Sequence, residues 1–416
     1  MNMDTSQRSG FRQRTLLAAA LLGLSSWALF VIGIDRPATA FFDEPKYVDP
    51  AKALLAGNPD ASPDGPPLGK LIIASSISIL GDNAYGWRAP SSVFGALTLA
   101  GIFLLANLLL DDFALALAAA AITLFNNLLY VFSRAAMMDT FLVTFAVWGI
   151  LAFTAALKMK SPAANKRRGL LAASGILLGL ACACKWNGVD ELCVAAVIGA
   201  ILFLCSGKTK NPEIELYGAN LREAGAGWFA AAFLVLPALA YLSAYWPYCR
   251  MLHLPFSAHV VGGMNLYIWK FHRAAGGNPP ILVPWYKWPL YTQPLRGFSY
   301  LVLNWYVMVA GLAAGVYCLR RLARSLPETL IVLLYLANLL QWAVTPQKFM
   351  YYYYYFPAAM FLGMAIPVAL SRLPIRLFGV RLSVVAVLPA LCVFIYCFAR
   401  IANLSAPFDC MLGCWL

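Results

Sequence analysis

The sequence has few charged residues. Asp, Glu, Lys and Arg together make up 12% of its 416 residues, whereas a soluble domain carries about a quarter. Hydrophobic residues reach 62%, and the mean hydropathy is +0.72. So few charges cannot cover a surface that faces water, and the apolar side chains must therefore face lipid or one another. The composition excludes a soluble globular protein and predicts an all-α, polytopic membrane protein.

Histidine is also scarce, and the three residues fall in one stretch, at His253, His259 and His272. No spacing among the ten cysteines resembles a zinc site, so we expect no metal centre. Cys410 and Cys414 would form a disulfide if their tail faces an oxidising compartment, and the alternative is a free pair.

Acidic residues are outnumbered by basic ones, 18 to 31, which gives a formal charge of +13. In a soluble protein this excess would suggest a nucleic-acid partner. Here the basic residues lie in short loops between apolar runs, as the positive-inside rule describes. We therefore expect no nucleic-acid partner.

Long apolar runs dominate the chain, and a spanning helix needs about 20 such residues. We expect eleven spans, at 15–34, 91–110, 113–132, 138–157, 169–184, 188–206, 226–245, 298–318, 328–345, 350–370 and 382–401. With the N-terminus in the cytoplasm, every dense basic cluster falls on the cytoplasmic side, which supports both the number and the orientation. No small-residue cleavage site stands out at the first run, so we expect it to be retained.

Two connections on the outer side are long, at 35–90 and 246–297. Both are too polar to span and too aromatic for linkers, and long loops in compact proteins are usually functional. Segments 46–57 and 68–80 are expected to form short helices at the membrane surface. We expect one transmembrane domain, 1–416, in which these loops cover an active site without a separate soluble domain.

A pair of adjacent carboxylates, Asp43 and Glu44, follows the first span and is the strongest local signal. Pro45 suits the first turn of a helix, and Asp43 is expected at its N-cap. A carboxylate kept ionised by that helix end can take a proton from an acceptor hydroxyl. The alternative is a capped, solvated loop without chemistry.

Isolated charges are predicted at the outer ends of helices and in the first outer loop. They are Lys70, Arg88, Arg134, Asp139, Lys185 and Lys348. A charge near membrane depth is costly, and converging cations would suit a phosphate leaving group. The alternative is that each one snorkels or pairs, for instance Arg134 with Asp139.

Aromatic residues cluster in the same regions. Five consecutive tyrosines, 351–355, begin the tenth span, and Trp285 lies in the second outer loop. Most of these side chains fit an interfacial belt, while Tyr352 and Trp285 are candidates for contacts with a sugar or phosphate.

Taken in order along the chain, these segments resemble the motifs of the protein O-mannosyltransferase family. The matching positions are Asp43-Glu44 with Tyr47, Pro66-Pro67-Leu68-Gly69-Lys70, Gly86-Trp87-Arg88-Ala89-Pro90, Arg134 with Asp139, Lys185-Trp186-Asn187-Gly188, and Lys348 with the tyrosine run. Gly65 stands where that family usually has His, and Lys348 where Arg is common. No large domain interrupts 246–297, so the chain resembles a compact prokaryotic relative of the plasma membrane.

The resemblance implies a GT-C type fold and a single displacement with inversion at the anomeric carbon. The donor would be a polyprenyl-phosphate-linked mannose or related hexose, and the acceptor a Ser or Thr hydroxyl of a protein. Asp43 would be the general base, and Glu44 would orient the acceptor or hold the interfacial helix. The leaving phosphate would be met by Arg134, Lys185, Lys348 and Lys70, with Tyr47, Arg88, Asp139, Tyr352 and Trp285 as further substrate contacts. No metal or other cofactor would be required.

Three other functions stay open at this point. Lipid A aminoarabinose transferases share the scaffold, so the acceptor could be a lipid or a glycan. A transporter or lipid flippase would also explain the helices, although it predicts charges at helix centres and repeats between halves. A catalytically silent scaffold is the third. The sequence leaves open the sugar, the length of the lipid carrier, and whether the chain acts alone or as a dimer.

Overall fold

The computed structural model describes residues 5–58, 64–160, 163–274, 283–291, 302–345 and 351–402. Its side chains are described from residue 13 onward. The N-terminal half contains α1 (Thr5–Val31), α2 (Pro45–Leu55), α3 (Leu68–Leu80), α4 (Ala84–Leu110), α5 (Phe113–Leu124), α6 (Asn127–Phe132), α7 (Met138–Leu157), α8 (Ala164–Cys184), the 3-10 turn η1 (Trp186–Gly188) and α9 (Val189–Cys205).

The remaining elements continue the helical pattern. They are α10 (Pro212–Ala224), α11 (Ala226–Ala230), the π-helical turn η2 (Ala231–Val235), α12 (Leu236–Ser243), α13 (Tyr245–Met251), α14 (Ala258–Ala274), η3 (Trp285–Leu290), α15 (Trp305–Arg320), α16 (Leu326–Val344), η4 (Tyr352–Tyr355), α17 (Phe356–Ser371), α18 (Leu382–Val385) and α19 (Val387–Ala402). A two-residue hairpin, β1 (Arg376–Leu377) with β2 (Val380–Arg381), is the one strand pairing in the described part of the chain. The all-α prediction is confirmed.

Nine helices of the described residues are long and apolar enough to cross a membrane. The predicted spans at 113–132 and 298–318 correspond instead to shorter apolar helices, α5 and α15. The first of these ends early because Asn126 starts a new helix, accepting a hydrogen bond from the backbone N–H of Leu128 with its side chain. The number eleven therefore stays a prediction.

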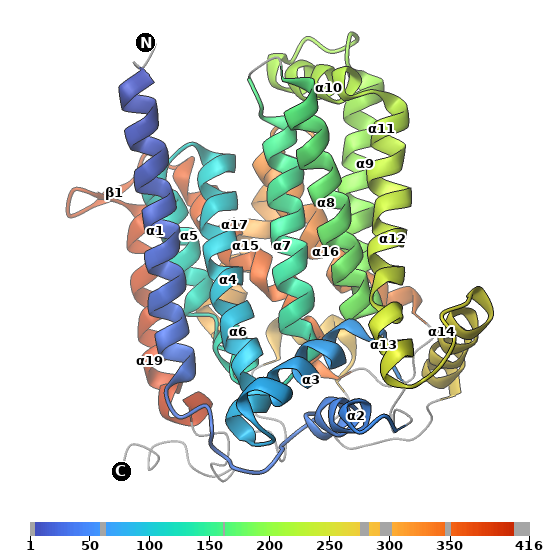
Figure 1. Ribbon diagram of the computed structural model, residues 1–416. Helices are drawn as coiled ribbons and strands as arrows, with labels where there is room; N and C mark the ends of the chain where they lie inside the picture. Colours follow the sequence, from blue (N-terminus) through green and yellow to red (C-terminus); the bar gives the residue numbers. More distant parts are fainter. Residues whose placement is uncertain are drawn as a thin grey trace.

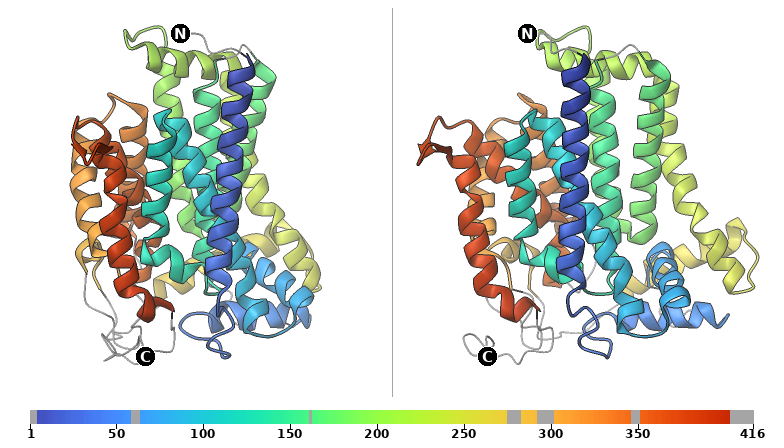
Figure 2. Two further views of the ribbon diagram at one scale, coloured as in Figure 1. Left: turned by 90° about the vertical axis from the view of Figure 1, so that its left-hand side faces the viewer. Right: turned by 60° about the vertical axis from the view of Figure 1, so that its left-hand side comes forward.

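The long helices run side by side between two distinct ends (Figure 1). α2, α3 and α14 gather at one end, whereas α10 and the start of α1 lie at the other, as Figure 2 also shows. The expected helices at 46–57 and 68–80 are thus observed as α2 and α3, while α10, α14 and the hairpin were not anticipated from the sequence.

Small residues allow the helices to approach closely. A Cβ atom added at Gly175 of α8 would lie 1.8 Å from the carbonyl oxygen of Ala232, and one at Gly179 would lie 2.4 Å from that of Pro237. Membrane helices associate largely through such close backbone packing. α8 is therefore held directly against η2 and α12, and its last residue leads straight into the functional region.

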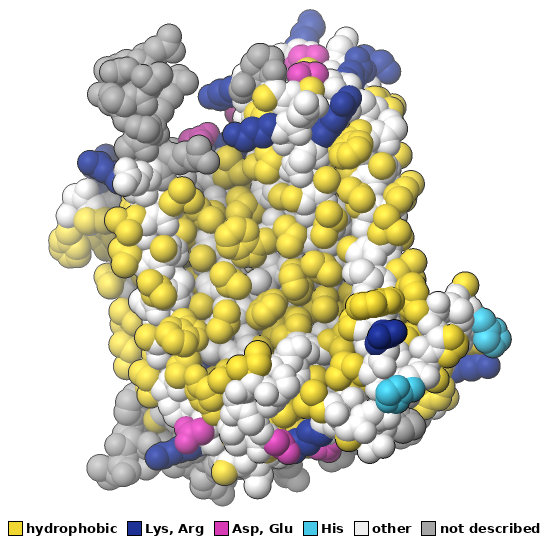
Figure 3. Space-filling view, in the orientation of Figure 1, with side chains coloured by type: hydrophobic (Ala, Val, Ile, Leu, Met, Phe, Trp, Pro, Cys, Tyr) yellow, Lys and Arg dark blue, Asp and Glu magenta, His cyan; other side chains and the backbone are white. Residues whose placement is uncertain are grey.

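The surface divides into a hydrophobic flank and two polar ends. Figure 3 shows hydrophobic side chains covering the side of the bundle, with Lys and Arg gathered at the end that carries α10. Exposed Leu204, Leu234 and Ile201 belong to this flank. A flank of this kind suits contact with lipid chains, and the carboxylates of the first outer loop lie at the end opposite to the basic cluster.

Candidate active site

Asp43 is held from both sides at the start of α2. Its Oδ1 lies 2.9 Å from the Lys46 ammonium, and its Oδ2 accepts a hydrogen bond from the Tyr353 hydroxyl at 2.5 Å. The preceding residue, Phe42, has a φ of +57°, a left-handed conformation that is costly for a bulky side chain. Burial lowers the pKa of Lys46, but the charge of Asp43, the hydrogen bond to it and the nearby Tyr351 and Asp64 together raise it, so the net shift is upward.

The N-cap prediction for Asp43 is wrong. The N-cap position of α2 is Glu44, and no side chain caps the helix. The reason is that each of the two carboxylates has a stronger partner elsewhere: Asp43 pairs with a cation and a hydroxyl, and Glu44 with a buried guanidinium.

Glu44 is fully buried in a bidentate pair with Arg88 of α4. The Nε–Oε1 and Nη2–Oε2 distances are both 2.8 Å. Glu44 also accepts hydrogen bonds from the backbone N–H groups of Ala136, at 2.8 Å, and Phe41, at 3.1 Å. Both oxygens are thus fully used, and Glu44 does not line the cavity described below.

The Arg88 guanidinium also forms hydrogen bonds with the loop after α1. Arg88 donates to the carbonyl oxygens of Ile34, Pro37 and Thr39 at 2.8–3.0 Å, so that all five of its N–H donors are used. The Glu44–Arg88 pair therefore joins this loop to α4 and to the segment that precedes α7.

Lys185, at the junction of α8 and η1, is oriented by Asp139 in the first turn of α7. Its ammonium lies 2.8 Å from Asp139 Oδ1 and 4.5 Å from the centroid of the Tyr354 ring. The alternative pairing of Arg134 with Asp139 is wrong. Arg134 turns away, contacts the Tyr130 hydroxyl and donates to the carbonyl oxygen of Gly33 at 2.9 Å.

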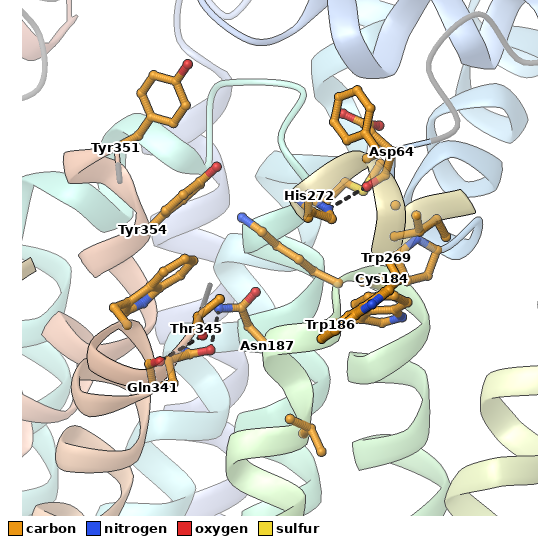
Figure 4. Close-up of a pocket in the computed structure, with 18 of the residues that line it drawn as sticks. Asp64, Cys184, Trp186, Asn187, Trp269, His272, Gln341, Thr345, Tyr351 and Tyr354 are labelled. Atoms are coloured by element: carbon orange, nitrogen blue, oxygen red, sulfur yellow. Dashed lines mark hydrogen bonds between the residues drawn. The ribbon is translucent and has the colours of Figure 1, made fainter. Parts of the chain in front are cut away.

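Asp43 and Lys185 line one cavity of about 550 Å³ at this end of the bundle. Its walls come from segments far apart in the sequence (Figure 4): the first outer loop, η1, α14, the end of α16 and the tyrosine run. Besides Asp43 and Lys185, the lining includes Lys46, Tyr47, Asp64, Trp186, Asn187, Trp269, His272, Arg273, Gln341, Trp342, Tyr351, Tyr353 and Tyr354.

A contact between the two outer connections closes one side of the cavity. His272 Nε2 of α14 lies 2.8 Å from the backbone oxygen of Asp64 (Figure 4). Burial lowers the pKa of His272 and raises that of the Asp64 carboxyl. Lys70 is fully buried behind this contact, with its ammonium 3.8 Å from Asp64 Oδ1.

The predicted site residues fall into two groups. Asp43, Tyr47 and Lys185 line the cavity, and Asp139 orients Lys185 from behind. Six other candidates are absent from its lining: Glu44, Lys70, Arg88, Arg134, Tyr352 and Trp285. Lys348 lies outside the described residues, as do Cys410 and Cys414.

Among the described residues, no three His, Cys, Asp or Glu side chains gather closely enough to hold a metal ion.

Other lining residues were missed or misjudged from the sequence. Within the tyrosine run, Tyr351, Tyr353 and Tyr354 face the cavity, whereas Tyr352 is buried against Tyr291, with 5.4 Å between the ring centroids. A run of five identical residues gives no signal for which of them point inward. No sequence motif pointed to Gln341, which is a polar residue within the apolar helix α16.

Comparison of the sequence with known proteins finds a matching family. The profile of the family described as dolichyl-phosphate-mannose-protein mannosyltransferase matches residues 20–253, more than half of the chain. A polyprenol-phosphate-mannose–protein mannosyltransferase of Mycolicibacterium smegmatis is 27% identical over 237 residues, which cover 50% of this chain and 45% of the relative. The corresponding protein of Mycobacterium tuberculosis is 25% identical over 329 residues, covering 68% and 61%.

A solved structure supports the fold independently of the sequence match. ArnT from Cupriavidus metallidurans bound to undecaprenyl phosphate has a TM-score of 0.58 and 14% identity, covering 86% of this chain and 60% of that one. The chain thus has the GT-C membrane glycosyltransferase fold, and it spans about half the length of the first of the relatives it matches. The match over residues 20–253 places the chain in the dolichyl-phosphate-mannose-protein mannosyltransferase family.

Proposed function

We propose that the chain transfers mannose from a polyprenyl-phosphate-mannose donor to a hydroxyl group of a protein, most simply of Ser or Thr. The observation that carries the proposal is the shared cavity of Asp43 and Lys185, one a carboxylate and the other a cation. The names of the mycobacterial relatives supply the donor and the protein acceptor. The fold match to ArnT bound to undecaprenyl phosphate supports a lipid-phosphate carrier.

Asp43 is assigned as the general base. It takes the proton of the acceptor hydroxyl as that oxygen bonds to the anomeric carbon. The bond from this carbon to the phosphate oxygen breaks, and the polyprenyl phosphate leaves with the electron pair, so the configuration inverts. Lys46 and Tyr353 each hold one oxygen of Asp43, and a carboxylate has further lone pairs with which to receive the proton.

Lys185 is assigned to the leaving phosphate. Its ammonium reaches the cavity and is kept in place by Asp139, so it can meet the negative charge as the bond breaks. We assign Glu44, Arg88, Arg134 and Lys70 to positioning, because none of them lines the cavity. Lys348 stays a candidate for the phosphate on resemblance alone.

The reaction is placed at the outer face of the plasma membrane, with the N-terminus in the cytoplasm. This orientation is supported by the basic residues at the end that carries α10, opposite to the cavity. Binding both substrates at the surface of the membrane orients them, and the covering loops limit the access of water.

The test compares the wild type with Asp43→Asn. Purified protein is incubated with polyprenyl-phosphate-mannose and a Ser/Thr-rich peptide, and mannosyl-peptide is measured. We expect Asp43→Asn to reduce transfer about a thousandfold, since a positioned general base contributes roughly 10²–10⁴-fold. The matched control is Asp49→Asn, at an exposed carboxylate of the following helix α2, which should retain wild-type activity.

The products separate the alternatives. Release of free mannose without mannosyl-peptide, dependent on Asp43, would keep the donor and require another acceptor, such as a lipid or a glycan. If Asp43→Asn transferred mannose as fast as the wild type, the assignment of Asp43 would be wrong. Donor that binds but remains intact in every assay would contradict the enzyme and favour a transporter.

A further inference from the structure

The cavity has a polar floor that the proposed chemistry does not use. Asn187 of η1 and Gln341 of α16 both line the cavity, and Asn187 Nδ2 donates to Gln341 Oε1 at 2.9 Å. Figure 4 shows Asn187 between Gln341 on one side and Trp186 on the other. This amide pair lies where two membrane-spanning helices reach the cavity. At this depth a polar side chain costs more free energy than an apolar one.

A second layer of polar groups holds this pair from below. Gln341 Nε2 lies 3.4 Å from the carbonyl oxygen of Asn338, and the Gln341 side chain also interacts with Asp190. Asn338 donates in turn to Glu191 at 2.9 Å. Glu191 and Asn338 are 1% and 2% exposed. Asp190, Glu191 and Asn338 do not line the cavity, so they can act on a ligand there only through the amide pair. The layer fixes the direction in which Gln341, and through it Asn187, presents its polar atoms.

The occupant of this floor must carry hydrogen-bonding groups. A polyprenyl chain lying on Asn187 and Gln341 would remove water from both amides and offer them no partner, which costs free energy. Sugar hydroxyls can both donate to and accept from amides. Aromatic faces of the kind on which a sugar ring stacks line the same cavity. Trp186 is held by the Tyr241 hydroxyl at 3.0 Å, and Trp342 is stacked on Tyr354 with 4.6 Å between the ring centroids.

The chain itself links this floor to the phosphate position. Asn187 follows Lys185 by two residues, with only Trp186 between them. A ligand that meets the Lys185 ammonium with its phosphate therefore brings one of the groups attached to that phosphate close to Asn187. In a lipid-linked donor these groups are the polyprenyl chain and the sugar, and the two amides favour the sugar.

We propose that Asn187 and Gln341 form a subsite that recognises hydroxyl groups of the donor hexose, with Asp190, Glu191 and Asn338 as positioning residues beneath it. This inference rests on the proposed lipid-phosphate-sugar donor and adds the residues that select its sugar. A site that hydrogen-bonds a substrate hydroxyl discriminates strongly against analogues that lack it.

The experiment measures binding rather than turnover. The affinities of the full chain for polyprenyl-phosphate-mannose and for bare polyprenyl phosphate are determined for the wild type, Asn187→Ala and Gln341→Leu. The matched control is Asn58→Ala, at an exposed asparagine of the first outer loop. We expect the wild type to bind the mannosyl lipid more tightly than the bare phosphate. In both cavity variants the ratio of these affinities should fall about five- to tenfold, the effect of losing one or two neutral hydrogen bonds. Their affinity for the bare phosphate and the behaviour of Asn58→Ala should not change.

Each other outcome has a distinct meaning. If the variants weaken binding of both lipids equally, the pair merely supports the cavity and the subsite is wrong. Equal binding of the two lipids by the wild type would also overturn it. A wild type that binds neither lipid would remove the proposed donor and the inference together. Preferential binding of the mannosyl lipid without any transfer would contradict the proposed reaction and leave the sugar subsite standing.

Discussion

Two adjacent carboxylates, Asp43 and Glu44, have opposite environments. Asp43 is 13% exposed in its side chain and lines the cavity, whereas Glu44 is fully buried and saturated by hydrogen bonds. The local pattern could not distinguish their roles, because both are flanked by aromatic and helix-starting residues, and only the family resemblance assigned them different roles. The difference arises from Arg88, which lies 44 positions away from Glu44 and approaches it from α4.

This difference predicts a large effect of Arg88 on stability. Arg88→Gln leaves Glu44 as a buried carboxylate without its cation, and breaking a buried pair costs about 3–5 kcal/mol. Denaturant unfolding in detergent should show a loss of this size. The control is Lys52→Gln, which breaks the partly exposed Lys52–Asp82 pair and should cost less than about 1 kcal/mol. Equal losses in the two variants would show that the Glu44–Arg88 pair does not hold the loop.

At the scale of elements, α14 is the part of the second outer connection that reaches the cavity. Val261 and Ile268 are its buried side chains, while Leu266, Tyr267 and Trp269 are about half exposed. The sequence predicted that this connection is functional and aromatic, but it did not predict the helix. α14 meets the first outer connection through His272 and Asp64, which lie 208 residues apart.

The docking of α14 should depend on pH. Burial lowers the pKa of His272, so the docked state binds fewer protons than the undocked one, and its stability falls as the pH drops below about 6.5. Relative to the intrinsic exchange rate at each pH, hydrogen exchange of the amides at 258–274 should become at least about threefold faster between pH 7.5 and pH 5.5.

The control must keep the charged groups around His272. Burial raises the pKa of the Asp64 carboxyl, so protonation of Asp64 at low pH would favour docking and oppose the destabilisation caused by His272. The charge of Lys185 further lowers the pKa of His272. His272→Gln keeps these neighbours, and its exchange relative to the intrinsic rate should stay constant across this range. If the variant responds to pH as the wild type does, the titrating group is not His272.

At the scale of the whole molecule, one end carries a basic cluster and the other carries the cavity. The end with α10 carries Arg168, Lys208, Lys210 and Arg222, whereas the other end carries the cavity. In the orientation that we propose from the positive-inside rule, the first end faces the cytoplasm and the cavity faces outward.

Labelling in intact cells tests this orientation. Single substitutions Asp49→Cys in α2 and Lys210→Cys before α10 introduce thiols at exposed positions of the two ends. A maleimide that does not cross membranes should label Asp49→Cys in intact cells, and Lys210→Cys only after permeabilisation, both measured above the background of the unsubstituted chain. The reverse pattern would invert the topology and place the proposed reaction on the cytoplasmic side.

The general architecture follows from the sequence because its causes are local. A bilayer accepts only segments that satisfy their own backbone hydrogen bonds, so runs of about 20 apolar residues become helices wherever they lie in the chain. The run at 138–157 accordingly appears as α7 with the same bounds, and the run at 328–345 appears as α16 with small shifts of its ends. The ordered motifs from Asp43 to Lys185 likewise sufficed to suggest the family.

The cavity was decided by contacts that no local pattern encodes. Asp139 pairs with Lys185 and not with Arg134. Tyr353 reaches Asp43 across 310 residues, while Tyr352 beside it does not line the cavity. Which face of a helix or turn meets the cavity depends on how the whole bundle packs, and a rotation of one residue exchanges a buried side chain for a lining one. The amino-acid sequence thus determined the helices, the membrane and the family, whereas only the packing of distant helices decided which side chains share the site.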